Sequence, residues 1–233
     1  MYARGYTAKR LLLEKEFLRR LVLSLVMEVS MGVKPDHWIS QMARDYKMIE
    51  PFHESQMREG KISFGLSSYG YDFRVGQDYK VFQEGSVNFL DPKKVSDESF
   101  GDFRGDHCVI NPGAFVLGQS VEYFRIPRNI LTICMGKSTY ARCGILINIT
   151  PFEPEWEGHV TMSISNVGLV PVKIYSGEGI AQVIFLESSE VCQTSYADRK
   201  GKYQAQKGIV LSKIDDSDGS VMTDTDREDE QAI

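Results

Sequence analysis

The feature that most limits the fold is a series of short apolar segments between Cys108 and Glu187, which Gly, Pro, Asn and Asp interrupt. The segments are short for ordinary helices and rich in the β-branched and aromatic residues that favour strands. Residues 108–117 indicate a strand, a turn and a second strand, and further strands are expected at 121–127, 130–135, 145–150, 159–165, 170–175 and 182–187. Many short strands with regular turns predict a mainly β barrel or jelly-roll-like sandwich.

The N-terminal part of the chain has a helical pattern instead. Residues 35–49 predict a helix, with Pro35 and Asp36 near its start and apolar side chains at helical spacing. The apolar positions are Trp38, Ile39, Met42 and Tyr46. Residues 1–30 are basic and amphipathic, which is compatible with a targeting or membrane-surface helix, with a packing helix, or with an extension before a start at Met31.

Composition and charge limit the classes of function. Residues 31–213 are expected to form the folded domain, and residues 214–233 form an acidic tail for which disorder is expected. The net charge of −5 argues against a general nucleic-acid-binding surface, and no apolar run approaches the length of a bilayer span. Four cysteines, at positions 108, 134, 143 and 192, form no Cys-x-x-Cys pair. They are expected to be reduced, mostly buried thiols of a cytoplasmic protein.

The segment from Gly136 to Gly144 carries a cation, two hydroxyls and a guanidinium between two glycines. Lys137 and Arg142 supply charge, and Ser138 and Thr139 supply short hydroxyl donors, which suits a cradle for phosphate oxygens. A polar turn between strands explains the same residues equally well. The spacing is not that of the common P-loop.

This segment and the turn at 153–159 closely resemble the nucleotide-binding motifs of the dCTP deaminases, which are trimeric relatives of dUTPases. Further similar segments lie at 67–74, 120–127, 179–182 and 196–208, so the resemblance covers about residues 32–210. It implies a dUTPase-like distorted β-barrel with a short N-terminal helical part. It also implies a homotrimer with sites between subunits, and hydrolysis of dCTP to dUTP and ammonia in pyrimidine deoxynucleotide metabolism.

The resemblance also implies which residues contact nucleotide, namely Lys137, Ser138, Thr139, Tyr140, Ala141, Arg142, Thr161, Met162, Ser163, Gln182, Tyr196, Lys202 and Gln206. Within this set, Ser138, Arg142 and position 163 would be catalytic, and the late segment with Tyr196 would fold over the bound nucleotide. Mg²⁺ would arrive with the triphosphate of dCTP, dUTP or dTTP.

Several of these residues also have simpler explanations. Asp72 is either a turn or ion-pair residue, or a support of the phosphate site through a hydrated metal. Gln182 is either a buried amide bonded to backbone or a contact to base or sugar, and residues 196–208 alone would read as a flexible loop. His159 is expected to be structural, and Trp156 to be a packing anchor rather than a stacking platform.

Zinc-dependent deamination of nucleobases is excluded by the sequence. That class needs a His-x-Glu motif and a Pro-Cys-x-x-Cys motif to hold zinc and move protons, and neither occurs here. If this chain deaminates a base, it therefore does so without zinc, as the resemblance also implies.

Position 163 departs from the resembled pattern, because Ser163 stands where a catalytic Glu is expected. A serine is no base at neutral pH without an activator. The chain could be a nearly inactive homologue that still binds nucleotide, a changed site in which Glu153, Glu155 or Glu157 serves, or the product of an introduced substitution. A dUTP pyrophosphohydrolase in which Glu153 activates water, and a regulatory module that senses dCTP or dTTP, also remain open.

Overall fold

The computed structural model describes residues 32–214. The expected extension at residues 1–30 lies outside these residues, and so does the acidic tail from residue 215 onward.

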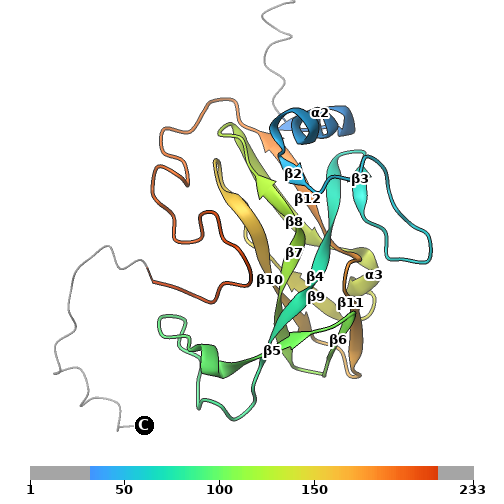
Figure 1. Ribbon diagram of the computed structural model, residues 1–233, viewed down its shortest axis with the longest axis vertical. Helices are drawn as coiled ribbons and strands as arrows, with labels where there is room; N and C mark the ends of the chain where they lie inside the picture. The colour runs from blue at the N-terminus through green and yellow to red at the C-terminus, as the bar shows by residue number, and fades with distance from the viewer. Residues whose placement is uncertain (1–31, 215–233) are drawn as a thin grey trace, which may run out of the picture.

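A curled, ten-stranded antiparallel sheet forms most of the molecule (Figure 1). Its central order is β1-β12-β4-β7-β10-β9, with β2 paired to β7, β3 and β5 to β4, and β8 to β12, while β6 and β11 form a separate pair. The strands are β1 (Gly32–Val33), β2 (Ile49–Glu50), β3 (Gly65–Ser67), β4 (Gly70–Phe82), β5 (Phe100–Arg104), β6 (His107–Ile110), β7 (Phe115–Arg125), β8 (Ile130–Gly136), β9 (Ile145–Asn148), β10 (Glu157–Asn166), β11 (Val172–Tyr175) and β12 (Gly179–Glu187). This architecture confirms the mainly β prediction.

Every strand expected from the sequence is present, with shifted boundaries. The expected strands at 115–117 and 121–127 are one continuous strand, β7, because residues 118–120 continue the extended backbone between them. The strands β1 to β5 were not expected; the longest of them is β4, and Ile49 of β2 falls inside the helix expected at 35–49. β4 pairs with β3, β5, β7 and β12, so it connects the β1–β12 side of the sheet with the β7–β10–β9 side.

Within residues 32–214, three short helical segments accompany the sheet: α2 (Asp36–Tyr46), the 3-10 helix η1 (Asp97–Ser99) and α3 (Ser138–Ala141). α2 confirms the predicted helix, and Ile39 and Ala43 turn toward the core. Tyr46 was expected on the apolar face, but it is 66% exposed, because the helix ends there and Lys47 turns the chain in the left-handed region. None of the helices in residues 32–214 is long and apolar enough to cross a membrane.

Strand β10 has the alternation that the sequence predicts. Val160, Met162 and Ile164 are buried in the core, whereas Thr161 and Ser163 lie half-buried on the other face. Position 163 is thus directed away from the core.

The cysteines are all free but less buried than expected. Cys108 is buried, Cys134 and Cys192 are half-buried, and Cys143 is exposed. Cys143 follows the one-turn helix α3, whose outer surface faces solvent, and this position explains its exposure.

Candidate active site

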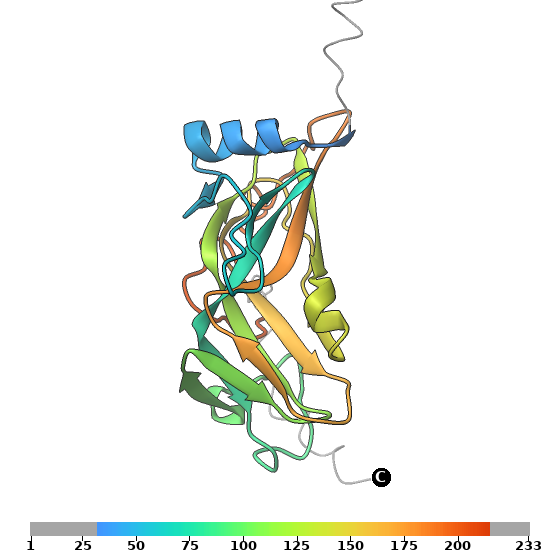
Figure 2. The same ribbon diagram turned by 90° about the vertical axis from the view of Figure 1, so that its right-hand side faces the viewer.

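The residues predicted to contact nucleotide fall into two groups (Figures 1 and 2). One group surrounds α3, which faces the viewer in Figure 2. The other lies along β10 and the segment after β12, and this last segment is on the far side of the molecule in that view. We call residues 188–214 the C-terminal arm. The structure therefore brings each group together but does not join the two.

The α3 group is centred on an ion pair. Lys137 precedes the helix in an extended conformation, and its Nζ lies 2.6 Å from Oδ2 of Asp72 on β4. The amide of Gln56 donates to the same oxygen at 3.1 Å. Both charged side chains are largely buried, at 12% and 9% exposure. The ion-pair interpretation of Asp72 is confirmed, and a phosphate that contacts Lys137 has to compete with this carboxylate.

A polar cavity of about 560 Å³ lies beside the ion pair. Its walls are Asp36, Glu54, Ser55, Gln56, Arg58, Ser63, Leu66, Ser67, Ser68 and Asp72. Gln182 is opposite Asp72 in the β12–β4 register, and its amide donates to Ser67 Oγ at 2.9 Å. Gln182 therefore belongs to the α3 group, and its amide binds a side chain rather than the expected backbone.

The helix α3 divides its side chains between core and solvent. Tyr140 is buried, and its hydroxyl accepts a hydrogen bond from the Tyr175 N–H at 2.9 Å. Burial raises the pKa of Tyr140 to about 12. Ser138, Thr139, Ala141 and Arg142 are exposed. The Arg142 guanidinium donates to the Ser138 carbonyl at 2.9 Å, which leaves further N–H donors of this exposed group for a ligand.

The second group lines a larger cavity, of about 720 Å³, between the start of β8, the turn before β10, and the C-terminal arm. Its walls are Leu131, Ile149, Thr150, Pro151, Phe152, Glu153, Pro154, Trp156, Val160, Thr161, Tyr196, Lys202, Tyr203, Gln206 and Val210. Four residues predicted from sequence, Thr161, Tyr196, Lys202 and Gln206, thus meet at one cavity. Apolar walls with a few polar groups suit a nucleoside.

Hydrogen bonds connect the polar walls of this cavity. Thr161 Oγ1 accepts from the Val210 N–H at 3.2 Å and from the Gln206 amide at 3.3 Å. Gln206 also donates to the His159 carbonyl. Lys202 Nζ donates to the Lys213 carbonyl at 2.5 Å. The arm is therefore attached to β10 at the residues that the sequence assigns to nucleotide.

Ser163 lies one step further along the same face of β10. Its direct neighbours in the sheet are Leu117 on β7 and Asn148 on β9, and neither is a carboxylate. Met162 is fully buried, so only its backbone can contact a ligand. The strand provides a hydroxyl at position 163, and nothing directly opposite it can act as a base.

The three glutamates of the turn have different surroundings. Glu153 lines the larger cavity and forms an ion pair with Arg199 of the arm. Glu155 pairs with Arg128 at 2.7 Å, and Glu157 lies 3.8 Å from Arg125. Glu153 is therefore the one glutamate of the turn that borders the cavity.

The two ring residues near the cavity have structural surroundings. Trp156 is 7% exposed, lies 5.1 Å from the Phe152 ring centre, and donates from Nε1 to the Tyr203 carbonyl at 2.9 Å. This burial confirms Trp156 as a packing anchor. His159 Nδ1 lies 3.1 Å from the Ser120 carbonyl, and its ring packs edge-on against Tyr123.

Two residues that no sequence motif includes, Gln56 and Arg128, now belong to these groups, together with Ser67 of the segment 67–74, for which no role was predicted. Gln56 joins the Asp72 ion pair, Ser67 binds Gln182, and Arg128 holds the arm. None stands in a pattern that predicts its partner, because each partner lies far away in the sequence. In residues 32–214, no three His, Cys, Asp or Glu side chains lie close enough together to hold a metal ion.

A curled antiparallel sheet with a phosphate-type loop and a separate nucleoside-sized cavity defines a class of nucleotide-binding β protein. Comparison with known proteins makes this specific: the chain belongs to the dCTP deaminase-like family, whose model matches residues 33–188. The expected family is thereby confirmed.

Individual relatives agree with this assignment. The chain is 56% identical over 188 residues to a dCTP deaminase of Nitrosomonas europaea, and 59% identical over 187 residues to one of Acidithiobacillus ferrooxidans. These matches cover 79% and 78% of this chain and the full length of both relatives. A crystal structure of the 2'-deoxycytidine 5'-triphosphate deaminase from Agrobacterium tumefaciens has a similar fold, with a TM-score of 0.53 at 14% identity. That match covers 68% of this chain and 49% of the Agrobacterium chain.

Proposed function

We propose that this protein is a dCTP deaminase, which converts dCTP and water to dUTP and ammonia. The observation that carries the proposal is the full-length match, at 56% and 59% identity, to two dCTP deaminases. The larger cavity supports it, because its apolar walls suit a pyrimidine and sugar, and its edge offers Thr161, Gln206 and Lys202 as polar contacts.

The reaction needs water to attack C4 of the cytosine ring and the exocyclic amine to leave as ammonia. A general base takes a proton from the water, and a proton must reach the ring or the leaving amine. In this proposal Arg142 and Ser138 donate hydrogen bonds to the substrate, and the arm carrying Tyr196 excludes water from the reacting atoms.

The proposed assembly is a homotrimer in which one subunit supplies the α3 group and its neighbour supplies the cavity. The separation of the two groups within one chain supports this arrangement. So does the outer face of β8, where Leu131, Ile133 and Met135 are 42%, 44% and 61% exposed. Alternate apolar side chains on one strand form a surface that a second copy can cover.

The proposal places the protein in the cytoplasm and includes Mg²⁺ carried by the triphosphate. Mg²⁺ retains several waters and needs few protein ligands. Asp72 is the carboxylate nearest the phosphate-type loop, so it would support the hydrated ion, in competition with Lys137. The ion would neutralise phosphate charge.

A second function is favoured by Ser163 and by the position of Glu153. A homologue without the base at 163 could bind nucleotide without deamination. It could instead cleave dUTP to dUMP and pyrophosphate, with Glu153 activating the water from the cavity wall. The serine hydroxyl favours these alternatives, and the relatives favour the deaminase.

One experiment separates these functions. Pure protein is incubated with dCTP and with dUTP, and ammonia and pyrophosphate are followed separately. We expect ammonia from dCTP. Pyrophosphate from dUTP without ammonia would support the pyrophosphohydrolase, and calorimetric binding with neither product would support an inactive homologue. Absence of both binding and products would refute every nucleotide function proposed here.

A further inference from the structure

The C-terminal arm lies in a defined position although it has no helix or strand in the part that the structure describes. It runs beside the turn and first residues of β10 (Figure 1). Backbone and side-chain hydrogen bonds connect the two segments: the Tyr196 N–H donates to Pro154, Trp156 donates to Tyr203, Gln204 donates to Glu155, the Ala205 N–H donates to Glu157, and the His159 N–H donates to Gln206. The arm is thus docked against the turn and β10 by contacts within the chain itself.

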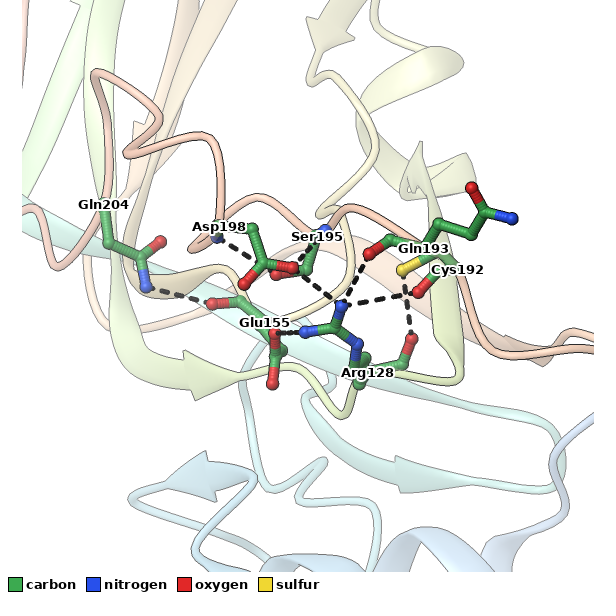
Figure 3. A network of polar contacts seen from close by, with 7 residues as sticks. All are labelled: Arg128, Glu155, Cys192, Gln193, Ser195, Asp198 and Gln204. Atoms are coloured by element: carbon green, nitrogen blue, oxygen red, sulfur yellow. Dashed lines mark hydrogen bonds and ion pairs between the residues drawn. The ribbon is translucent and has the colours of Figure 1, made fainter.

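Arg128, in the turn between β7 and β8, joins the start of the arm to this docked region (Figure 3). Its guanidinium donates to Glu155 at 2.7 Å and to Asp198 at 2.7 Å. It also donates to the backbone carbonyls of Gln193 at 3.0 Å and Cys192 at 3.4 Å. We call Arg128, its two carboxylate partners and these two carbonyls the Arg128 latch.

Hydrogen bonds within the arm hold Asp198 in the position from which it contacts Arg128. The Asp198 carboxylate accepts from the Ser195 N–H at 3.0 Å, and the Ser195 hydroxyl accepts from the Asp198 N–H at 3.2 Å. The Ser195 N–H and the Arg128 guanidinium hold the pKa of Asp198 below its usual value. This reciprocal pair closes a tight turn over residues 195–198, which contains Tyr196, a wall of the larger cavity.

We infer that Arg128 is a positioning residue that holds the C-terminal arm closed over the larger cavity in the absence of ligand. The inference rests on the proposed function only in taking that cavity as the nucleoside site. Arg128 is not among the cavity walls, so it acts through the arm. If the latch keeps the arm closed, its loss reduces the closed fraction, and the apparent affinity for nucleotide falls in the same proportion.

An arginine is required at this place because four acceptors surround one side chain. The planar guanidinium offers five N–H donors in a fixed fork, whereas a lysine ammonium is a point charge with three. Arg128→Lys should therefore restore part of the function that Arg128→Ala removes.

The first measurement is hydrogen exchange of the arm without nucleotide. We expect Arg128→Ala to speed exchange of the amides that dock the arm, at Tyr196 and Ala205, by roughly tenfold, with Arg128→Lys between it and the parent. Amides in the core of β10 should keep their rates. The matched control is Arg104→Ala, which removes an exposed ion pair with Asp78 between β5 and β4.

The second measurement is calorimetric affinity for dCTP. We expect the affinity of Arg128→Ala to fall by the same factor as the closed fraction measured by exchange. Unchanged arm exchange would overturn the inference, and so would a loss of affinity with unchanged exchange, because Arg128 would then act directly. If the parent binds no nucleotide, the proposed function fails, while the exchange result still decides whether Arg128 closes the arm.

A second variant guards against misfolding. Asp198 is on the surface, so Asp198→Asn removes the charge with little change of shape. If Arg128→Ala fails to fold, Asp198→Asn should still show faster arm exchange with an unchanged core. Exchange at the parent rate in this variant would overturn the inference.

Discussion

At the scale of single residues, Ser163 limits the chemistry of the proposed site. Its hydroxyl is half-buried on β10, and its neighbours across the sheet are Leu117 and Asn148. Neither can take a proton from serine or water at neutral pH. Loss of a general base typically lowers a rate by ~10²–10⁴-fold. The parent protein should therefore deaminate dCTP slowly unless another group supplies the base.

Ser163→Glu should raise ammonia release from dCTP by ~10²-fold or more, because the strand already directs position 163 away from the core. Ser165→Glu, two residues further on the same face, is the matched control and should give no gain. If Ser163→Glu folds and binds dCTP but remains inactive, position 163 is not the site of the missing base. Parent turnover at ~1 s⁻¹ or above would redirect the search to Glu153→Gln.

Arg142→Ala should weaken binding of dCTP, dUTP and dTTP by ~1.5–3 kcal/mol, as expected for hydrogen bonds from a charged group. The exposed guanidinium donates to the Ser138 carbonyl, four residues away in the same turn of helix. Loss of this local contact should leave folding intact. Calorimetry with Arg104→Ala as control tests this. Equal affinity of the Arg142 variant and the parent would remove Arg142 from the site.

At the scale of elements, the sequence predicts most strands from β6 to β12 because each is a short apolar run between turn residues. It does not predict β4. That strand contains Gly76 and the charged residues Asp72, Arg74 and Asp78, so its apolar alternation is broken. Its extended state depends on pairing with β3, β5, β7 and β12, which a local pattern does not reveal.

Gly158, at the start of β10, controls how closely the arm can approach. Its φ of 147° lies in the region that favours glycine, and a Cβ there would meet Gln206 N at 3.1 Å and the Trp156 ring at 3.1 Å. Gly158→Ala should lower the free energy of unfolding by ~1–3 kcal/mol and speed exchange of the arm amides.

The control for this prediction is Gly113→Ala. Gly113 has a φ of 76°, but a Cβ there would meet nothing within 4 Å. Both variants should lose stability in thermal unfolding, and only Gly158→Ala should loosen the arm. Equal arm exchange in the two would show that close approach at Gly158 does not hold the arm.

At the scale of the whole molecule, sequence motifs identify the segments of the site but not their arrangement. Lys137 and Thr161 each lie where the sequence expects a nucleotide contact, yet they belong to separate groups. The pairing of Lys137 with Asp72, 65 positions apart, is likewise invisible in the motif. The separation of the two groups and the pairing of Lys137 with Asp72 in space both depend on the curl of the sheet, so only the folded chain reveals them.

The exposed face of β8 should lie in an interface of the proposed trimer. Ile133→Glu would bury a charge in that interface, so light scattering should show a smaller assembly than that of the parent, and calorimetry should show loss of nucleotide binding. Tyr46→Glu, on the exposed end of α2, is the control and should leave the assembly unchanged. A parent protein that is a stable monomer with full affinity would refute the shared site.

The separation of the two groups also has a genetic consequence. If each site draws α3 from one subunit and the cavity from another, two differently defective copies can complement each other. Co-expression of an Arg142 variant with a variant blocked at Thr161 would give mixed assemblies, in which about a quarter of the sites combine two intact halves. Each variant alone would bind nucleotide only weakly, yet the mixture would contain sites with the affinity of the parent. For the same reason, when one defective and one intact gene are expressed together, a defective subunit would also inactivate sites to which an intact subunit contributes the other half.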